Sequence, residues 1–124
     1  GTALRAYTSK GDGIILFSPV YHSFKKIIQA NDRNPIECRM DLCKGKYYLD
    51  LGRLEGMLTG QEKMIIFCSP HNPGGRIWSL EVQRELAYFC KRHNLLLIID
   101  EIHNDLVFPK NKHVTFPLAA EVLP

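Results

Sequence analysis

Apolar runs and polar loops alternate most clearly between Lys63 and Phe108, where Met64 to Phe67 predicts a short strand. Leu95 to Ile99 is an unbroken aliphatic run, which is typical of a strand buried on both faces. Between these runs, Ser79 is suited to cap the start of a helix. The apolar positions after it have helical spacing, namely Val82, Leu86, Phe89 and Cys90. A strand, a helix and a second strand form a βαβ unit, so the two strands should run parallel.

The rest of the chain also mixes helical and strand patterns. The other expected elements are a helix ending over Ala3 to Thr8, a strand over Ile14 to Phe17, a helix over His22 to Ala30, a strand over Pro35 to Leu42, a loop or short extended piece over Tyr47 to Leu51 and a short helix over Arg53 to Leu58. His113 to Pro117 should be irregular, and Pro117 to Val122 looks amphipathic. The order of elements predicts an α/β fold throughout.

Two polar loops follow the strands of the βαβ unit. One presents His71 and Asn72, and the other begins with Asp100 and carries His103. The carboxyl ends of parallel strands share one edge of a sheet, where ligands gather. Asp100 directly follows the last aliphatic residue, and a partly buried carboxylate there needs a partner. The sequence therefore predicts a polar pocket built from two loops, with His71 shaping the first of them.

Composition narrows the possible partners. A net charge of +3 on 124 residues is too small and too dispersed to indicate nucleic acid. No apolar run approaches the roughly 20 residues of a membrane span, so we expect no membrane partner. The four cysteines lack zinc-site spacing, which favours free thiols, a cytoplasmic protein and no metal. His22, His93 and His113 have no partner pattern and are expected at the surface.

Three motifs resemble a known family. FSPVYHSF (17–24), SPHNPGGRIW (69–78) and DEIHNDLVF (100–108) are similar to the large domain of fold type I enzymes that use pyridoxal 5'-phosphate (PLP). Within the class I/II aminotransferase superfamily, they are most similar to MalY/PatB-type cystathionine β-lyases. The resemblance implies a three-layer α/β/α fold with a mostly parallel sheet. It covers residues 1–124, which would be an internal piece of that domain with both ends cut.

The resemblance also implies cofactor-binding roles for four residues. Asp100 would pair with the pyridinium nitrogen of PLP, and Asn72 would donate its amide to the phenolic oxygen. Tyr21 would stack on the cofactor ring. His103 stands where many relatives carry a tyrosine that donates to the same oxygen. The residues alone allow simpler roles: Asp100 capping a turn, Asn72 forming an Asn-Pro turn, and Tyr21 and His103 being structural.

The chain departs from the family pattern in one loop and lacks other parts of the site. Asn-Pro-Thr-Gly is common in the family, whereas this chain has Asn72-Pro73-Gly74-Gly75, and the second glycine should loosen the turn. No catalytic residue is expected within the chain, because the Schiff-base lysine would lie beyond Pro124. The loop for the cofactor phosphate would lie before Gly1, and the arginine for the substrate carboxylate in a further domain. The chain alone is therefore expected to be inactive.

The implied function is PLP-dependent carbon–sulfur β-lysis in amino acid metabolism. A small-molecule amino acid substrate would yield a thiol, pyruvate and ammonia, and the parent protein would be a homodimer. Two alternatives stay open: a PLP-dependent aminotransferase, and a non-catalytic module with a PLP-enzyme-like or Rossmann-like fold. A nucleotide-binding module fits less well, because no glycine-rich phosphate fingerprint follows a strand.

Overall fold

The computed structural model describes residues 1–109 and 111–116 of the chain. Its elements are α1 (Thr2–Tyr7), β1 (Gly13–Ser18), α2 (His22–Gln29), β2 (Asn34–Arg39), β3 (Asp41–Cys43), β4 (Lys46–Tyr48), α3 (Leu51–Met57), β5 (Glu62–Cys68), α4 (Leu80–Arg92) and β6 (Leu96–Asp100). This order confirms the α/β prediction, including the βαβ unit formed by β5, α4 and β6. The amphipathic-looking stretch over 117–122 lies outside the described residues.

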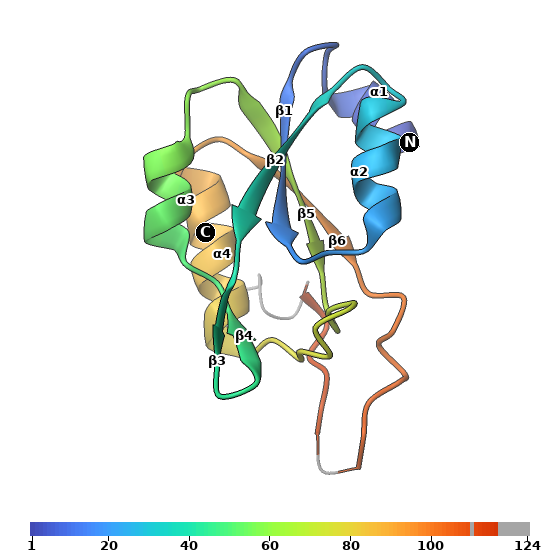
Figure 1. Ribbon diagram of the computed structural model, residues 1–124, viewed down its shortest axis with the longest axis vertical. Helices are drawn as coiled ribbons and strands as arrows, with labels where there is room; N and C mark the ends of the chain where they lie inside the picture. Colours follow the sequence, from blue (N-terminus) through green and yellow to red (C-terminus); the bar gives the residue numbers. More distant parts are fainter. Residues whose placement is uncertain (110, 117–124) are drawn as a thin grey trace.

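The main sheet has the strand order β2-β1-β5-β6, and each neighbouring pair is parallel (Figure 1). The register of β5 and β6 places Cys68 opposite Asp100, the last residue of each strand. The predicted parallel pair is therefore confirmed. Because all four strands run in one direction, the loops that follow them leave from the same end of the sheet.

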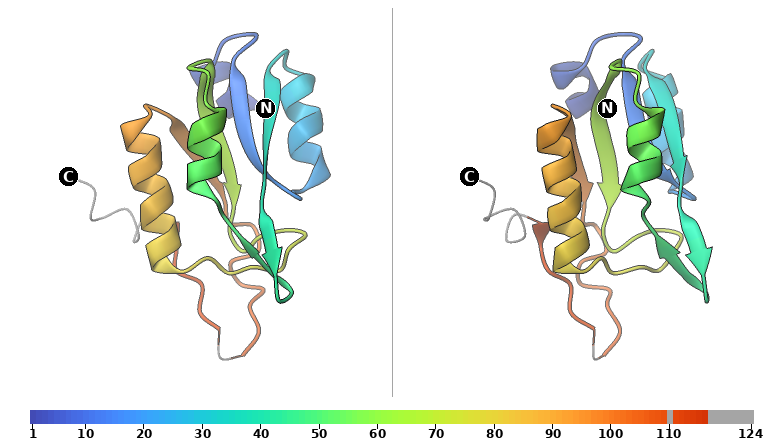
Figure 2. Two further views of the ribbon diagram at one scale, coloured as in Figure 1. Left: turned by 60° about the vertical axis from the view of Figure 1, so that its left-hand side comes forward. Right: turned by 90° about the vertical axis from the view of Figure 1, so that its left-hand side faces the viewer.

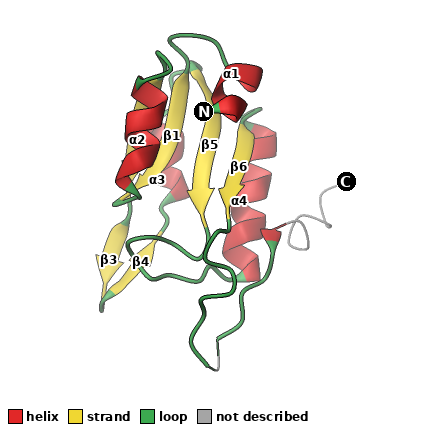
Figure 3. Ribbon diagram, turned by 90° about the vertical axis from the view of Figure 1, so that its right-hand side faces the viewer, coloured by secondary structure: helices red, strands yellow, loops and turns green. Residues whose placement is uncertain are grey.

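Helices cover both faces of this sheet (Figures 2 and 3). Successive side chains of a strand point to opposite faces, so β1 contributes Ile15 and Phe17 to one core and Ile14 and Leu16 to the other. The first core is closed by helices α3 and α4, and the second by α1 and α2. The helical core residues are Leu54, Leu86, Phe89 and Cys90 on the first face and Leu4 and Ile28 on the second. The three-layer α/β/α arrangement is confirmed.

Side-chain hydrogen bonds cap the first turns of helices α3 and α4. Ser79 Oγ accepts from the Val82 N–H at 3.4 Å, which confirms the predicted cap of α4. Asp50 Oδ1 accepts from the Arg53 N–H at 2.8 Å, so α3 begins at Leu51, two residues before the predicted start.

No helix among the described residues has the length and apolar character needed to span a membrane.

The predicted single strand from Pro35 to Leu42 is wrong, because β2 ends at Arg39. Its neighbour β1 ends at Ser18, whose carbonyl accepts a final bond from the Met40 N–H at 2.8 Å. With no further strand to pair with, the chain forms the antiparallel hairpin β3–β4. Its turn contains Lys44 and Gly45, both with positive φ, as tight hairpin turns require. The extended piece expected near Tyr47 is strand β4.

Strand β6 is less buried than its aliphatic sequence predicts. Its residues stay partly exposed, and Leu96 is 37% exposed. Within the described part of the chain, β6 lies at the edge of the sheet and pairs with β5 alone. The prediction of a strand buried on both faces is therefore wrong for this chain as it stands.

Candidate functional site

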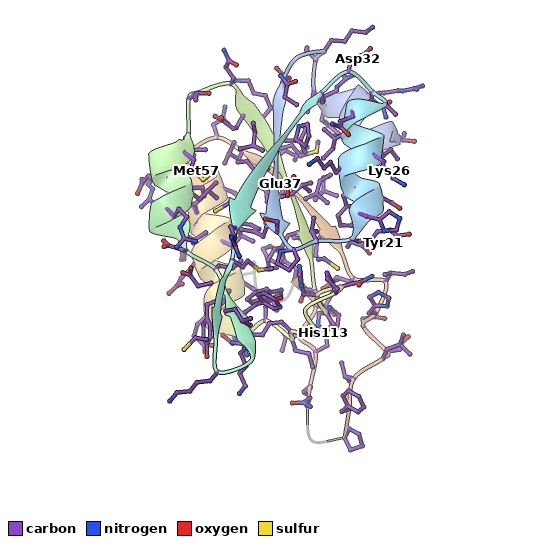
Figure 4. The ribbon with its side chains drawn as sticks, viewed as in Figure 1. Tyr21, Lys26, Asp32, Glu37, Met57 and His113 are labelled. Atoms are coloured by element: carbon purple, nitrogen blue, oxygen red, sulfur yellow. The ribbon has the colours of Figure 1, made fainter. Side chains whose placement is uncertain are left out.

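A cavity of about 480 Å³ lies where β1, β5 and β6 end. It is lined by Tyr21, Cys68, Asn72, Asp100, Ile102 and His103. All four residues singled out from the sequence therefore meet at one place, although they come from three separate loops. Tyr21 lies where β1 leads into α2, and the residue is 41% exposed (Figure 4). Cys68 and Ile102 complete the wall. Ile102 directly precedes His103, and Cys68 ends the strand before the Asn72 loop; these positions are the signal that could have found them.

Asp100 is held by backbone bonds at the end of β6. Its Oδ1 accepts from the Ile102 N–H at 3.1 Å, and its carbonyl accepts from the Ser69 N–H at 3.0 Å. The carboxylate thus caps the following turn, as the simpler sequence interpretation expected. Its second oxygen has no hydrogen-bond partner among the described residues, so that oxygen can accept from a ligand. Turn formation and ligand binding are compatible here, because the turn orients the carboxylate.

Asn72 lies in a loop that is closed by several hydrogen bonds. The His71 N–H donates to the Arg76 carbonyl, and the Gly75 N–H donates to the His71 carbonyl, both at 2.8 Å. Trp78 Nε1 also donates to the Cys68 carbonyl at 3.0 Å, which ties the end of the loop back to β5. The side-chain amide of Asn72 has no partner in the described part of the chain. It can therefore donate to a ligand in the cavity.

His71 is a neutral structural support for this loop. The residue is 4% exposed, and its Nδ1 accepts from the Gly74 N–H at 3.2 Å. An accepting Nδ1 places the ring proton on Nε2 in the neutral form. Burial lowers the pKa of His71 to about 4, and the nearby Phe17 carbonyl opposes this shift in part. His71 therefore carries no charge near neutral pH, which agrees with its predicted role in shaping the loop.

Gly74 is closely packed, so the second glycine does not loosen the turn as expected. A Cβ at this position would lie 2.7 Å from His71 Nδ1 and 2.7 Å from Tyr47 Cδ2. Such distances are far below normal contact, so no side chain fits here without movement of a neighbour. Gly75 differs, because it has a φ of +59° and open space around it. Close approach explains the glycine at 74, and backbone conformation explains the glycine at 75.

Burial of Cys68 raises the pKa of its thiol, which stays protonated. Its Sγ lies 3.2 Å from the Pro70 carbonyl, to which the thiol donates. Cys68 therefore adds a neutral, apolar wall to the cavity. It is one of four free cysteines, of which Cys43 alone is exposed.

His113 is buried against Glu101, so its predicted surface position is wrong. Its side chain is 5% exposed, and its Nε2 lies 2.9 Å from Glu101 Oε1. The Phe116 N–H donates to the same oxygen at 2.9 Å. These contacts bring residues 113–116 back to the residue beside Asp100. No sequence pattern marked this pair, because the two residues are joined only by folding.

The fold and the cavity define a class of protein: a three-layer α/β/α domain with a polar ligand site at the carboxyl ends of parallel strands. The family model described as aminotransferase class I and II matches residues 1–122. The chain therefore belongs to the class I and II aminotransferase family.

Known proteins similar to the chain include lyases. It is 32% identical to Protein MalY of Escherichia coli over 112 residues, which are 90% of this chain and 29% of MalY. It is 35% identical to cystathionine β-lyase PatB of Bacillus subtilis over 115 residues, 92% of this chain and 30% of PatB. The structure of a PLP-bound C-S lyase from Staphylococcus hominis matches with a TM-score of 0.93 and 29% identity, covering 98% of this chain and 31% of the lyase. The chain thus spans less than a third of the length of these relatives.

Proposed function

We propose that this chain is part of the cofactor-binding large domain of a PLP-dependent carbon–sulfur β-lyase. The observation that carries the proposal is the convergence of Tyr21, Asn72, Asp100 and His103 on one cavity. Support also comes from the names of two similar proteins, a cystathionine β-lyase and a PLP-bound C-S lyase.

The groups around the cavity fit the chemistry of PLP. The free oxygen of Asp100 can accept from a protonated ring nitrogen, and such charge-assisted bonds are among the strongest in proteins. The amide of Asn72 can donate to the phenolic oxygen, as can a ring nitrogen of His103. The partly exposed ring of Tyr21 offers a flat surface for stacking. The ring nitrogen and the phenolic oxygen of the cofactor are thereby each matched by a group of the required kind.

Each residue would help the chemistry in its own way. When bound, PLP supplies an electron sink for the electron pair released at the α-carbon of an amino acid. Asp100 keeps the proton at the ring nitrogen, because a carboxylate stabilises the neighbouring positive charge. Asn72 and His103 stabilise negative charge at the phenolic oxygen. Tyr21 covers one face of the ring and excludes water there.

The proposed substrate is an amino acid with sulfur on its β-carbon. Breaking the carbon–sulfur bond, with the uptake of one water molecule, would yield a thiol, pyruvate and ammonia. An aminotransferase is the second candidate, because the matching family model carries that description and the reaction would use Asn72 and Asp100 equally. His103 favours the lyase, since a histidine at this position is typical of the β-lyase-like branch that the chain resembles, whereas many other relatives carry a tyrosine.

The test uses the complete native polypeptide, purified and supplied with PLP. We expect pyruvate to be released from cystathionine without any added 2-oxo acid. Amino transfer that requires a 2-oxo acid, with no pyruvate from any carbon–sulfur substrate, would instead establish the aminotransferase. PLP binding is measured by absorbance while the cofactor-free protein is titrated with PLP. Absence of binding would exclude both candidates.

We further propose that the native protein is a cytoplasmic homodimer. Family members are typically dimers, and the free, buried thiols of Cys38, Cys68 and Cys90 suit a reducing compartment. Light scattering of the complete polypeptide tests the dimer: a mass of twice the polypeptide supports it, and a monomer mass contradicts it. Fractionation of the source cells tests the compartment.

A further inference from the structure

We propose that Tyr47 is a positioning residue for Asn72: from the hairpin β3–β4, its ring packs against Gly74 and His71 and thereby holds the loop that presents the Asn72 amide. The inference rests on the proposed role of Asn72 at the cofactor. It adds a residue outside the three sequence motifs, on an element whose position in the fold was not expected.

The first contact joins Tyr47 to the loop itself. The space that a Cβ of Gly74 would occupy is bounded by Tyr47 Cδ2 and His71 Nδ1, each 2.7 Å away, and by Tyr47 Cε2 at 3.2 Å. The ring centroids of Tyr47 and His71 are 6.5 Å apart. The tyrosine ring thus presses on the loop from the outside, and His71 supports it from the inside through the bond from the Gly74 N–H. Asn72 lies between these two supported residues.

A second contact joins the same hairpin to the far side of the loop. The Arg76 guanidinium lies 5.2 Å from the ring centroid of Tyr48 and 5.7 Å from that of Trp78. These are cation–π distances, and the Arg76 carbonyl in turn accepts from the His71 N–H. Adjacent tyrosines of β4 therefore hold both ends of the segment from His71 to Arg76.

The hairpin is itself anchored, so it can act as a support. Arg53 of α3 donates to the Arg39 carbonyl at 2.6 Å and to Asp41 Oδ1 at 2.8 Å, at the base of the hairpin. Tyr47 also packs against the main core. A ring fixed in this way can restrict the loop, whereas a freely moving side chain would not.

The close contact means that Tyr47 and the absence of a side chain at 74 depend on each other. A methyl group at 74 must displace the Tyr47 ring or His71, and either movement shifts the neighbouring Asn72. If the ring is removed, His71 gains room to move away and the methyl group becomes easier to accommodate. The two positions should therefore be energetically coupled.

A double-mutant cycle on the complete native polypeptide tests this coupling. The variants are Tyr47→Ala, Gly74→Ala and the double variant, and the first measurement is the dissociation constant of PLP. We expect Gly74→Ala to weaken PLP binding by about tenfold alone, and by clearly less when Tyr47→Ala is also present. Gly75→Ala is the matched control. Its Cβ would meet nothing within 4 Å, so its cost should be the same with and without Tyr47→Ala.

A second measurement does not depend on the cofactor. In the cofactor-free protein, amide hydrogen exchange of the peptide over 69–78 should become faster in Tyr47→Ala and stay slow in Tyr47→Phe, which keeps the ring. If Tyr47→Ala does not accumulate as folded protein, Tyr47→Val takes its place in both measurements. Equal costs of Gly74→Ala in the two backgrounds, or unchanged exchange in the loop, would overturn the inference.

The failure of the proposed function would look different. If the unaltered protein does not bind PLP, or if Asn72→Ala leaves the absorption of bound PLP and its pH dependence unchanged, the role of Asn72 is wrong. The exchange measurement then still decides whether Tyr47 orders the loop. If Asn72→Ala changes the absorption and the cycle shows no coupling, Asn72 keeps its role and Tyr47 loses its own.

Discussion

Glu101 Oε1 and His113 Nε2 lie 2.9 Å apart, and this contact closes the loop that begins beside Asp100 and carries His103. The same oxygen accepts from the Phe116 N–H at 2.9 Å. A single carboxylate therefore fixes the returning chain next to the cavity. Val114 adds to this, because its carbonyl accepts from the buried Gln83 amide at 3.1 Å.

Removal of the Glu101 carboxylate should destabilise the protein. Glu101→Ala leaves two donors in a largely buried site without an acceptor, which costs about 1 to 3 kcal/mol in the free energy of unfolding. Glu101→Gln keeps an acceptor oxygen and should lose less. Urea unfolding of the cofactor-free polypeptide measures both variants. Equal stability of Glu101→Ala and the unaltered protein would mean that this contact contributes nothing.

Asp100→Asn should weaken PLP binding while leaving the fold intact. The amide oxygen of asparagine can still accept from the Ile102 N–H, so the turn is kept. The negative charge that the proposed function places opposite the ring nitrogen is lost, and a hydrogen bond to a charged group is worth about 1.5 to 3 kcal/mol, or about 10- to 100-fold in affinity. Titration with PLP gives the dissociation constant. Asp105→Asn, an exposed change in the same loop, is the control and should bind normally.

His71 should make the protein less stable in acid. Its pKa is about 4 when folded, against about 6.5 in an unfolded chain, so the unfolded state binds the proton more readily. The contribution of His71 to stability is complete above pH 6.5 and is lost as the pH falls toward 4. Urea unfolding between these pH values should show a smaller acid loss in His71→Gln. His22→Gln, at an exposed histidine, is the control and should lose as much stability in acid as the unaltered protein. An equally large loss of stability in His71→Gln would contradict this expectation.

Substitution of the buried residue Arg33 should strongly destabilise the N-terminal half of the chain. The residue is buried, and its guanidinium donates to the carbonyls of Leu4 and Thr8 at the end of α1 and to Thr8 Oγ1. The Leu4 carbonyl keeps its bonds from Thr8, but Arg33→Ala removes the guanidinium donor of the Thr8 carbonyl and the bond to Thr8 Oγ1, at a cost of about 3 kcal/mol. Arg33→Lys should recover part of this, because it keeps the charge without the planar fork. Thermal unfolding compares them, with the exposed Lys26→Ala as control; similar melting of Arg33→Ala and Lys26→Ala would contradict this role.

Much of the site was predictable because strand ends can be recognised locally. Asp100 follows directly after an aliphatic run, and Asn72 follows shortly after another, so a parallel sheet must bring them to one edge. Tyr21 required the resemblance as well, because an exposed aromatic after a strand has no fixed role. The cavity joins all three with His103.

The order of helices and strands outside the hairpin β3–β4, the parallel βαβ unit and the edge at which polar residues meet follow from the sequence by itself, because periodicity and caps act over a few neighbouring residues. Tertiary structure decided the burial of His113, the close packing of Tyr47 on Gly74 and the partial exposure of β6. Each of these depends on which distant segment becomes a neighbour. His113 is buried only because the chain returns to Glu101. Tyr47 reaches Gly74 only through the hairpin that forms where β2 has no further strand to pair with. Strand β6 is partly exposed because, among the described residues, it pairs with β5 alone. Local sequence patterns do not predict contacts between segments that are distant in the sequence.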